Sequence, residues 1–230
     1  MGAEHSNVPL ALNNLGKVLR DQGDLAGARE HLERALAIGE ATLGPEHPDV
    51  ATRLSSLGTV LEKQGDLTGA REHYERALAI REATLGPDHP DVAVDLNNLG
   101  SVLRAQGDLA GARGYLERSL AIRDVTLGPD HPDVAADLNN LGLVLRDQGG
   151  LAGARDHFER ALTLLEQALG PEHANVALAL NNLGEVLRAQ GDLAEARGYL
   201  ERALSIFEKA LGDKHPHTES VHQNLAALDG

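Results

Sequence analysis

The chain lacks several of the residues on which many folds and active sites depend. Its 230 residues include no cysteine and no tryptophan, and only two phenylalanines and three tyrosines. The absence of cysteine excludes disulfides, thiolate metal ligands and a cysteine nucleophile. Large aromatic rings normally fill the centre of a compact domain, so leucine and alanine must do most of the packing here. This composition is typical of thin layers of helix packed against helix.

A long apolar segment is also missing. No run approaches the roughly 18 apolar residues that indicate a membrane span, and no signal-peptide pattern is present, so we expect a cytoplasmic protein. The net charge is −14, from 35 acidic and 21 basic side chains. A field of this sign repels phosphate backbones and anionic lipids. We therefore expect no nucleic-acid partner and no membrane partner.

What the chain does contain is an internal repeat with a step of 42 residues. The segment Asn-Asn-Leu-Gly, or Ser-Ser-Leu-Gly in the second copy, ends at Gly16, Gly58, Gly100, Gly142 and Gly184. A Gln-Gly-Asp-Leu segment and a Leu-Gly-Pro-Glu-His-Pro linker recur at the same step, with small variations. A fixed period of this kind is the signature of a repeat architecture, so we expect one array over residues 2–230. Its repeats are expected at 2–43, 44–85, 86–127, 128–169 and 170–211, followed by a capping helix at 216–229.

Each repeat predicts two helices. Leu12 and Leu19 belong to an apolar stripe at helical spacing, and Gly23 supplies the left-handed residue that ends this helix. Asp24 is placed to cap the next helix, whose apolar stripe comprises Leu25, Ala28, Leu32, Ala35 and Leu36. Pro48 then suits the first turn of the following helix.

Small residues interrupt these stripes at fixed places. Gly16, Ala28 and Ala35 recur in nearly every copy. Where two helices cross at about 8–10 Å, the closest contacts leave no room for a long side chain. The alternation of large and small residues therefore predicts how the helices nest, and a small constant rotation per pair predicts a superhelix with a concave inner face.

These positions resemble a known family. The residues that match the signature of the tetratricopeptide repeat are Leu12, Leu15, Gly16, Leu19, Ala28, Leu32 and Ala35. The chain departs from that signature where Leu12 and Leu19 replace large aromatics, and its period exceeds the commoner 34 residues. The longer period and its linker resemble the subclass found in kinesin light chains and many bacterial regulators. The resemblance implies an all-α, right-handed superhelix of five helix-turn-helix repeats plus a C-terminal capping helix, acting in protein binding.

Composition adds a hypothesis about origin. The chain has four lysines against seventeen arginines, a bias that resembles proteins of high-GC bacteria. Similar arrays there form the sensor or scaffold part of larger signalling proteins, so the chain is expected to be a module or fragment of that kind. This parentage is an analogy with the family.

Eleven histidines in an acidic chain raise the question of metal binding. Six of them share one loop position: His5, His47, His89, His131, His173 and His215. Adjacent copies should lie roughly 10 Å apart, judged from helix packing, whereas zinc requires ligand atoms at about 2.0–2.2 Å. We therefore expect these histidines to help cap the next helix and to hold no metal or cofactor. An active site needs different residues converging on one atom, and here every candidate is repeated or isolated, so we expect no enzyme.

Two sets of polar residues remain. Pairs at i, i+4 predict a solvated ladder on the second helices: Arg29–Glu33, Arg71–Glu75, Arg113–Glu117, Arg155–Glu159 and Arg197–Glu201. On the first helices, the side opposite the apolar stripe carries amides and arginines, interrupted once by Glu62. The candidate peptide-binding residues are Asn13, Asn14, Arg20, Asn97, Asn98, Arg104, Asn139, Asn140, Arg146, Asn181, Asn182 and Arg188.

An amide both donates and accepts, which matches a peptide backbone of any sequence, and arginine binds carboxylates. The resemblance implies that this side lines the concave groove. We therefore expect a protein or peptide partner, with a preference for acidic segments, and a monomer in isolation. One alternative is that these asparagines only bond neighbouring helices. Another is that the array is a spacer or a self-associating scaffold, with end-to-end stacking.

Overall fold

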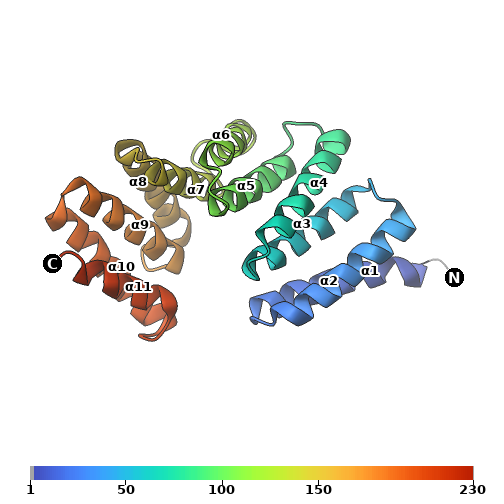
Figure 1. The fold of residues 1–230 in the computed structure, drawn as a ribbon, viewed down its shortest axis with the longest axis horizontal. Helices are drawn as coiled ribbons and strands as arrows, with labels where there is room; N and C mark the ends of the chain where they lie inside the picture. The colour runs from blue at the N-terminus through green and yellow to red at the C-terminus, as the bar shows by residue number, and fades with distance from the viewer. Residues whose placement is uncertain (1–2, 230) are drawn as a thin grey trace. The chain divides into compact units, whose positions relative to one another are not determined.

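The computed structural model describes the backbone of residues 3–229 and the side chains of residues 8–229. Within this part, the chain forms only α-helices and the turns between them (Figure 1). The helices are α1 (Ala3–Asp21), α2 (Leu25–Leu43), α3 (Pro48–Lys63), α4 (Leu67–Leu85), α5 (Pro90–Ala105), α6 (Leu109–Thr126), α7 (Val134–Asp147), α8 (Leu151–Leu169), α9 (Ala174–Gln190), α10 (Leu193–Leu211) and α11 (Pro216–Ala226).

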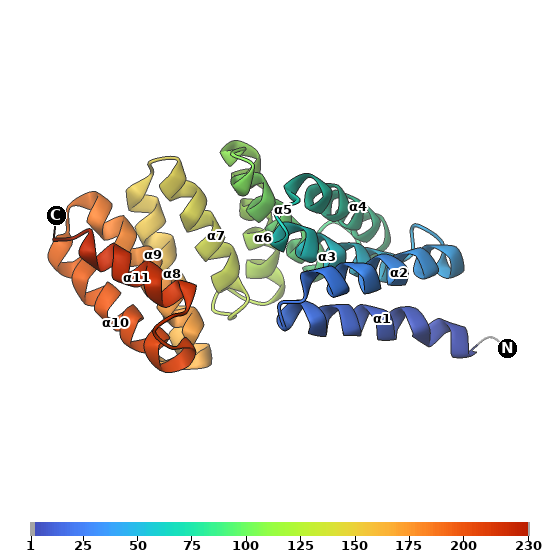
Figure 2. The same cartoon turned by 60° about the horizontal axis from the view of Figure 1, so that its bottom comes forward.

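The helices pack in pairs, as the sequence predicted. Each odd-numbered helix from α1 to α9 is followed by an even-numbered partner, and Figure 2 shows the antiparallel pair α1 and α2 side by side. Within each unit, second helices also pack against the first helix that follows, as α2 does with α3 and α8 with α9. The result is an all-α solenoid of five helix pairs, and α11 packs on α10 as a final capping helix.

Two compact units divide the array. Unit 1 comprises residues 1–122 and unit 2 comprises residues 123–230, so the division falls within α6. In unit 1, buried side chains such as Leu57, Tyr74 and Leu96 form the core between α2, α3, α4 and α5. In unit 2, Phe158 and Leu200 belong to one continuous core. Each unit therefore has a core of its own.

The turns follow the predicted chemistry. Gly23 and Gly44, which end α1 and α2, have φ angles of 85° and 91°, a region that favours glycine. The carboxylate of Asp24 accepts a hydrogen bond from the Gly27 amide at 2.9 Å and so caps α2. Gly150 provides no side-chain cap for α8, as expected.

Close packing explains the recurring small residues. A β-carbon placed on Gly16 would lie 2.6 Å from Leu32 Cγ, and one on Gly58 would lie 2.7 Å from a ring carbon of Tyr74. Both distances are too short for real contacts, so a larger residue would push the paired helices apart. Ala28 is also fully buried. The predicted nesting of large against small residues is confirmed.

Four loop histidines are helix caps, and His131 makes the same bond ahead of the later start of α7. Nδ1 of His47 accepts from the Asp49 amide at 3.1 Å, and the same bond to the second following residue forms at His89, His131, His173 and His215. The side chain of His5 lies outside the described residues. Helix α7 differs from its counterparts because it begins at Val134, two residues after Pro132. There the Ala135 amide bonds to Pro132 O at 3.0 Å, which tightens the first turn.

Candidate peptide-binding face

The amides and arginines predicted on the first helices form a continuous surface within unit 2. We call this surface, on α7, α9 and α11, the amide face; it consists of Asn139, Asn140, Arg146, Asn181, Asn182, Glu185, Arg188 and Asn224. The three helices are adjacent: α7 contacts α9, and bonds between side chains join α9 to α11. Most of these side chains are half-buried, and Arg188 is exposed.

Asparagine side chains bond from helix to helix across the amide face. Asn182 on α9 donates from Nδ2 to Asn139 Oδ1 on α7 at 2.8 Å. One repeat later, Asn224 on α11 donates to Asn181 Oδ1 on α9 at 2.9 Å. The second asparagine of each pair thus bonds the first asparagine of the preceding repeat. These bonds orient the amides, and they show that holding neighbouring helices together is one of their roles.

A glutamate occupies the centre of this network. Glu185 Oε2 lies 2.5 Å from Arg146 Nη1, in a half-buried ion pair that joins α9 to α7. Its other oxygen, Oε1, accepts from Asn181 at 3.2 Å and from Asn224 at 2.9 Å. Glu185 therefore compensates the charge of Arg146 within the fold. Of the two arginines predicted in unit 2, Arg188 is the one whose side chain is exposed.

The equivalent residues in unit 1 are less regular. Glu62 on α3 accepts from Ser101 on α5 at 2.9 Å and from the Tyr74 hydroxyl at 3.2 Å. Burial raises the pKa of Tyr74, so its hydroxyl stays protonated and donates. Arg20 bonds the neighbouring Asp21. A bond between serine and glutamate thus joins two first helices in unit 1, as bonds between asparagines do in unit 2.

The remaining candidates in unit 1 differ in exposure. Asn13 is only 4% exposed, and its Oδ1 is buried without a hydrogen-bond partner. Asn14 is exposed, whereas Asn97, Asn98 and Arg104 are half-buried. A ligand on this side would thus meet Asn14 directly and Asn13 only after a rearrangement.

The predicted ladder on the second helices is present in four of five places. Arg29, Arg71, Arg113 and Arg155 each lie 2.7 Å from the glutamate four residues ahead. The fifth pair was predicted wrongly: Arg197 bonds Asp229 instead of Glu201, because the end of the chain beyond α11 brings Asp229 to it. The paired side chains are largely exposed, as expected of a solvated ladder.

Sequence reasoning missed a second ladder, which ties each second helix to the preceding one. Arg76 on α4 lies 2.5 Å from Glu40 on α2 and donates to Pro45 O at 3.2 Å. Arg118, Arg160 and Arg202 contact an acidic side chain and a linker carbonyl in the same way. The strict recurrence of this arginine at the 42-residue step was the signal that could have revealed it.

Buried ion pairs were also missed. In unit 1, Arg81 on α4 bonds Asp95 on α5, where Asp95 is 0% and Arg81 is 8% exposed. Burial raises the pKa of Asp95, and Arg81 partly offsets that effect. In unit 2, Arg123 and Asp137 form the matching pair at 2.8 Å.

The positions of Arg81 and Asp95 change together from one repeat to the next. The pairs are Gly39–Arg53, Arg81–Asp95, Arg123–Asp137, Leu165–Ala179 and Phe207–Val221. A large residue on one helix thus meets a small or complementary one on the next. At the first pair, a β-carbon on Gly39 would lie 3.2 Å from the Arg53 side chain, so glycine leaves the space that this arginine occupies.

No metal centre is formed by the described residues. Nowhere in them do three histidine, aspartate or glutamate side chains converge as a metal site requires. Near the C-terminus, His217 stacks on Phe207 with ring centroids 5.5 Å apart. The ring centroids of His215 and His217 are 5.1 Å apart. Within the same part of the chain, none of the helices combines the length and the apolar character that a bilayer crossing demands.

Comparison with protein families now identifies the architecture. The family model described as "Tetratricopeptide repeat" matches residues 7–83, 54–124, 96–167, 136–209 and 175–229. The chain belongs to the tetratricopeptide repeat family. Repeats of this family are scaffolds that generally mediate interactions between proteins, and the match assigns no catalytic family.

Solved structures place this tetratricopeptide array near the kinesin-light-chain type, as its period and linker predicted. One is a structure of nearly identical TPR-like repeats named as a kinesin light chain of Podospora anserina. It has a TM-score of 0.72 and 26% identity, covering 92% of this chain and 99% of that chain. A single-substitution variant of those repeats has a TM-score of 0.73 and 26% identity, covering 91% of this chain and 98% of that chain.

A third solved structure shares the fold. BtubC (BKLC) from P. vanneervenii has a TM-score of 0.72 at 24% identity, covering 93% of this chain and 92% of that chain. A search of curated proteins found no match. The structural likeness therefore supports the fold and the repeat subclass, while the ligand has to be argued from the surface of this chain.

Proposed function

We propose that this chain is a protein-interaction module that binds a peptide or a flexible partner segment along its first helices. The observation that supports this most is the amide face of unit 2, where polar side chains are half-buried, fixed in position and repeated on adjacent helices. Each side-chain amide has two N–H donors and an oxygen with two lone pairs. The bond from Asn182 to Asn139 uses one donor and one lone pair. The pair keeps further donors and acceptors for a peptide backbone.

The charges on the amide face determine how strongly it should prefer acidic peptides. Glu185 compensates Arg146, so attraction of acidic segments depends mainly on the exposed Arg188 in this unit. An exposed charged contact contributes about 0.2–1 kcal/mol and weakens with salt. Binding through a few such contacts and backbone hydrogen bonds should be modest, with a Kd on the order of micromolar.

A peptide array tests this proposal. The array of overlapping acidic and neutral 12-residue peptides is probed with the chain, and the peptides that bind are titrated in solution. Arg188→Ala should weaken binding of acidic peptides by about 1.5- to 5-fold, which corresponds to the loss of one exposed contact. Arg202→Ala on α10 is the control, because Arg202 is a half-buried arginine that bonds Glu166 and Pro171 O on the second-helix side. Equal effects of the two substitutions would argue against the amide face as the binding surface.

A second candidate is a self-associating scaffold, and α1 provides the observation in its favour. Leu15 and Val18 are 42% and 51% exposed, whereas the equivalent Leu57 and Val60 are 2% and 0% exposed beneath α2. Self-association through α1 would make the sedimentation coefficient rise with concentration, and Val18→Lys would abolish that rise. Val125→Lys is the control, since Val125 is 87% exposed elsewhere on the chain. A coefficient independent of concentration would favour the peptide-binding module.

A further inference from the structure

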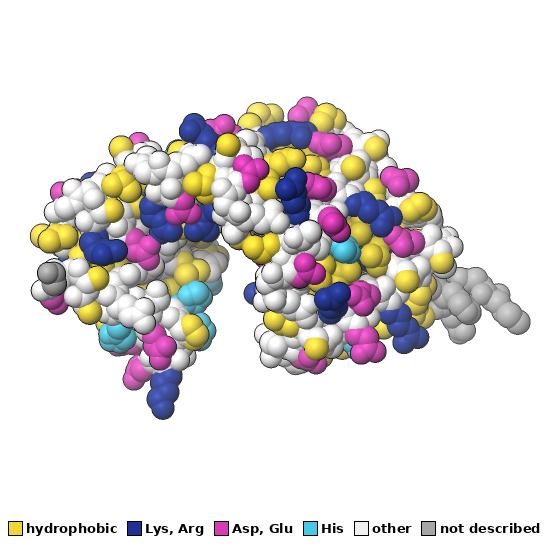
Figure 3. Space-filling model, in the orientation of Figure 1, with side chains coloured by type: hydrophobic (Ala, Val, Ile, Leu, Met, Phe, Trp, Pro, Cys, Tyr) yellow, Lys and Arg dark blue, Asp and Glu magenta, His cyan; other side chains and the backbone are white. Residues whose placement is uncertain are grey.

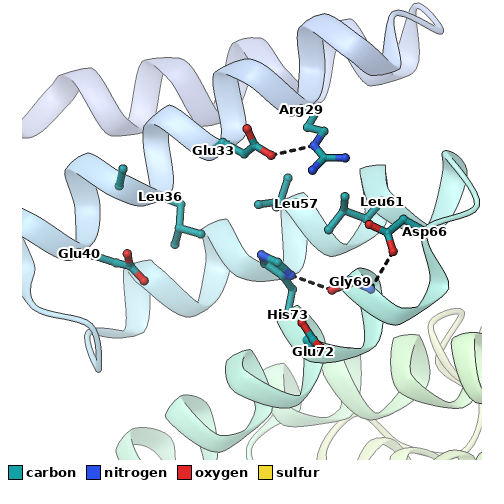
Figure 4. A pocket seen from close by; sticks show the side chains of 11 residues that line it. Arg29, Glu33, Leu36, Glu40, Leu57, Leu61, Asp66, Gly69, Glu72 and His73 are labelled. Atoms are coloured by element: carbon teal, nitrogen blue, oxygen red, sulfur yellow. Dashed lines mark hydrogen bonds and ion pairs between the residues drawn. The ribbon is translucent and has the colours of Figure 1, made fainter.

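A pocket of about 370 Å³ lies in unit 1 on the second-helix side, away from the proposed peptide-binding side chains. It is bounded by α2, α3 and α4, and Figure 4 shows the side chains that line it. Leu36, Leu57 and Leu61 form an apolar floor, while Arg29 and Glu33 stand at one edge as an ion pair of 2.7 Å. In Figure 3, hydrophobic side chains and a histidine are visible among charged ones on this face of unit 1.

One histidine borders the pocket on α4. Nδ1 of His73 lies 2.7 Å from Gly69 O on its own helix, so the imidazole is held against α4. A carbonyl oxygen only accepts, so Nδ1 carries the hydrogen. In the neutral ring, Nε2 is then an acceptor on the side chain that lines the pocket. His73 thus bounds the pocket on its α4 side, and the part of the pocket beside Arg29 and Glu33 is called its corner.

The chain's own repeats show what suits this corner. The positions equivalent to His73 are His31 on α2, Tyr115 on α6, His157 on α8 and Tyr199 on α10, so tyrosine and histidine both occur there. Tyr115 packs against the core of unit 1 and lies close enough to Arg71, the counterpart of Arg29, to affect it electrostatically. Tyr199 packs against the core of unit 2 and lies near Arg155. A tyrosine at this position therefore places its ring on the leucine floor and its hydroxyl beside the Arg–Glu pair.

We propose that the pocket between α2, α3 and α4 is a second binding site, which takes a tyrosine side chain from a partner protein. The ring would cover Leu36, Leu57 and Leu61, in the way that Tyr115 packs against the core of unit 1, which includes the equivalent Leu78 and Leu99. The phenol hydroxyl would meet Arg29 and Glu33. The site is distinct from the proposed peptide-binding face, because it uses the opposite side of the helix pairs.

Charge around the pocket indicates the neighbours of that tyrosine. Glu40 is paired with Arg76 on α4, and Asp66 caps α4 by accepting from the Gly69 amide at 2.9 Å. Glu72 also lines the pocket. Carboxylates therefore exceed guanidinium groups at the rim, so a basic residue beside the tyrosine fits better than an acidic one.

The probe for this site is the tripeptide acetyl-Lys-Tyr-Lys-amide, with acetyl-Lys-Gly-Lys-amide as its matched control. Methyl and amide NMR shifts of the wild-type chain should change at Leu36, Leu57, Leu61 and Gly69, with a Kd on the order of 1 mM for so small a ligand. The glycine tripeptide should leave the leucine methyls unchanged. Equal shifts with both tripeptides, or shifts only elsewhere on the chain, would overturn the proposal.

Substitutions at two equivalent histidines test whether the tripeptide occupies this pocket. His73→Tyr installs the residue found at the equivalent positions 115 and 199 and should weaken tripeptide binding at least tenfold by filling the corner. His157→Tyr makes the same change on α8, outside the pocket, and should bind as the wild type does. Equal binding by the wild type and His73→Tyr would refute the site, as would an equal loss in both variants. The shift map of the wild type decides the question even if a variant folds poorly.

Discussion

The buried pair Arg81–Asp95 offers the sharpest test of how adjacent repeats recognise each other. Asp95→Ala would leave the guanidinium of Arg81 buried at 8% exposure without its carboxylate. Its remaining side-chain partners would be Ser55 Oγ at 3.0 Å and Thr52 Oγ1 at 3.3 Å, both neutral. Removing one partner of a buried ion pair typically costs about 3–5 kcal/mol. We expect Asp95→Ala to lower the stability of unit 1 by this amount.

The chain itself supplies the compensating change. Leu165 and Ala179 occupy the same two positions in unit 2, so Arg81→Leu combined with Asp95→Ala copies a pair that the fold already accommodates. Replacing a buried ion pair by packed apolar residues is often neutral or stabilising by about 1–4 kcal/mol. The double variant should therefore be at least as stable as the wild type to within about 1 kcal/mol, although each single change is costly.

Urea unfolding followed by far-ultraviolet circular dichroism measures the four members of this cycle. Amide hydrogen exchange in α4 and α5 locates the effect, because each repeat interacts only with its neighbours. The expected interaction energy is several kcal/mol and opposite in sign to the single losses. If the double variant lost the sum of the two single losses, or if Asp95→Ala cost less than about 1 kcal/mol, the pair would not hold the interface as argued.

Four further predictions concern packing and pH. Ala112→Leu should overpack the α5–α6 crossing, where Ala112 is 0% exposed, and cost about 1–3 kcal/mol; an unchanged melting curve would contradict the nesting. Gly58→Ala should destabilise by a similar amount, because its β-carbon would lie 2.7 Å from Tyr74. Gly114→Ala, with nothing within 4 Å, should instead stabilise by about 0.8–1 kcal/mol. Burial, and secondarily the histidine two residues earlier, lower the pKa of His217 below 6.5. The neutral ring therefore stabilises the fold fully above pH 6.5, and this contribution is lost as pH falls through the folded pKa. Wild type should lose more stability than His217→Phe between pH 7 and 5 in urea titrations, and parallel losses would refute this.

The fold was predictable because its determinants recur. A glycine with positive φ such as Gly23, a capping aspartate such as Asp24 and a glycine at the helix crossing such as Gly16 act through local geometry. Each therefore acts in the same way in most copies; the exceptions are Gly150 and Asp192, which provide no side-chain cap. The capping role of the loop histidines was predicted for the same reason, since Nδ1 of His47 reaches an amide only two residues ahead.

The candidate site was predicted only as positions on a helix face. Helical spacing placed Asn182 and Arg146 on the first helices, but it did not show that Arg146 pairs with Glu185 or that Asn182 bonds Asn139. Those partners are 39 and 43 residues apart. Their contact depends on how one repeat is rotated relative to the next. The apolar stripe of a single helix does not determine that rotation.

Positions at which the copies differ indicate contacts that the recurring residues do not reveal. At the positions of Arg81 and Asp95, the chain changes both residues together, to Leu165 and Ala179 or to Phe207 and Val221. Such paired changes occur where two side chains share one buried space, because a charge or a volume altered on one side must be compensated on the other. The position of His73 changes without a compensating partner: it is histidine in three copies and tyrosine in two, while the leucines beneath it stay the same, and at His73 those leucines line a pocket. In a repeat array, a compensated departure therefore indicates an internal contact, whereas an uncompensated departure that opens a space indicates a surface available to another molecule.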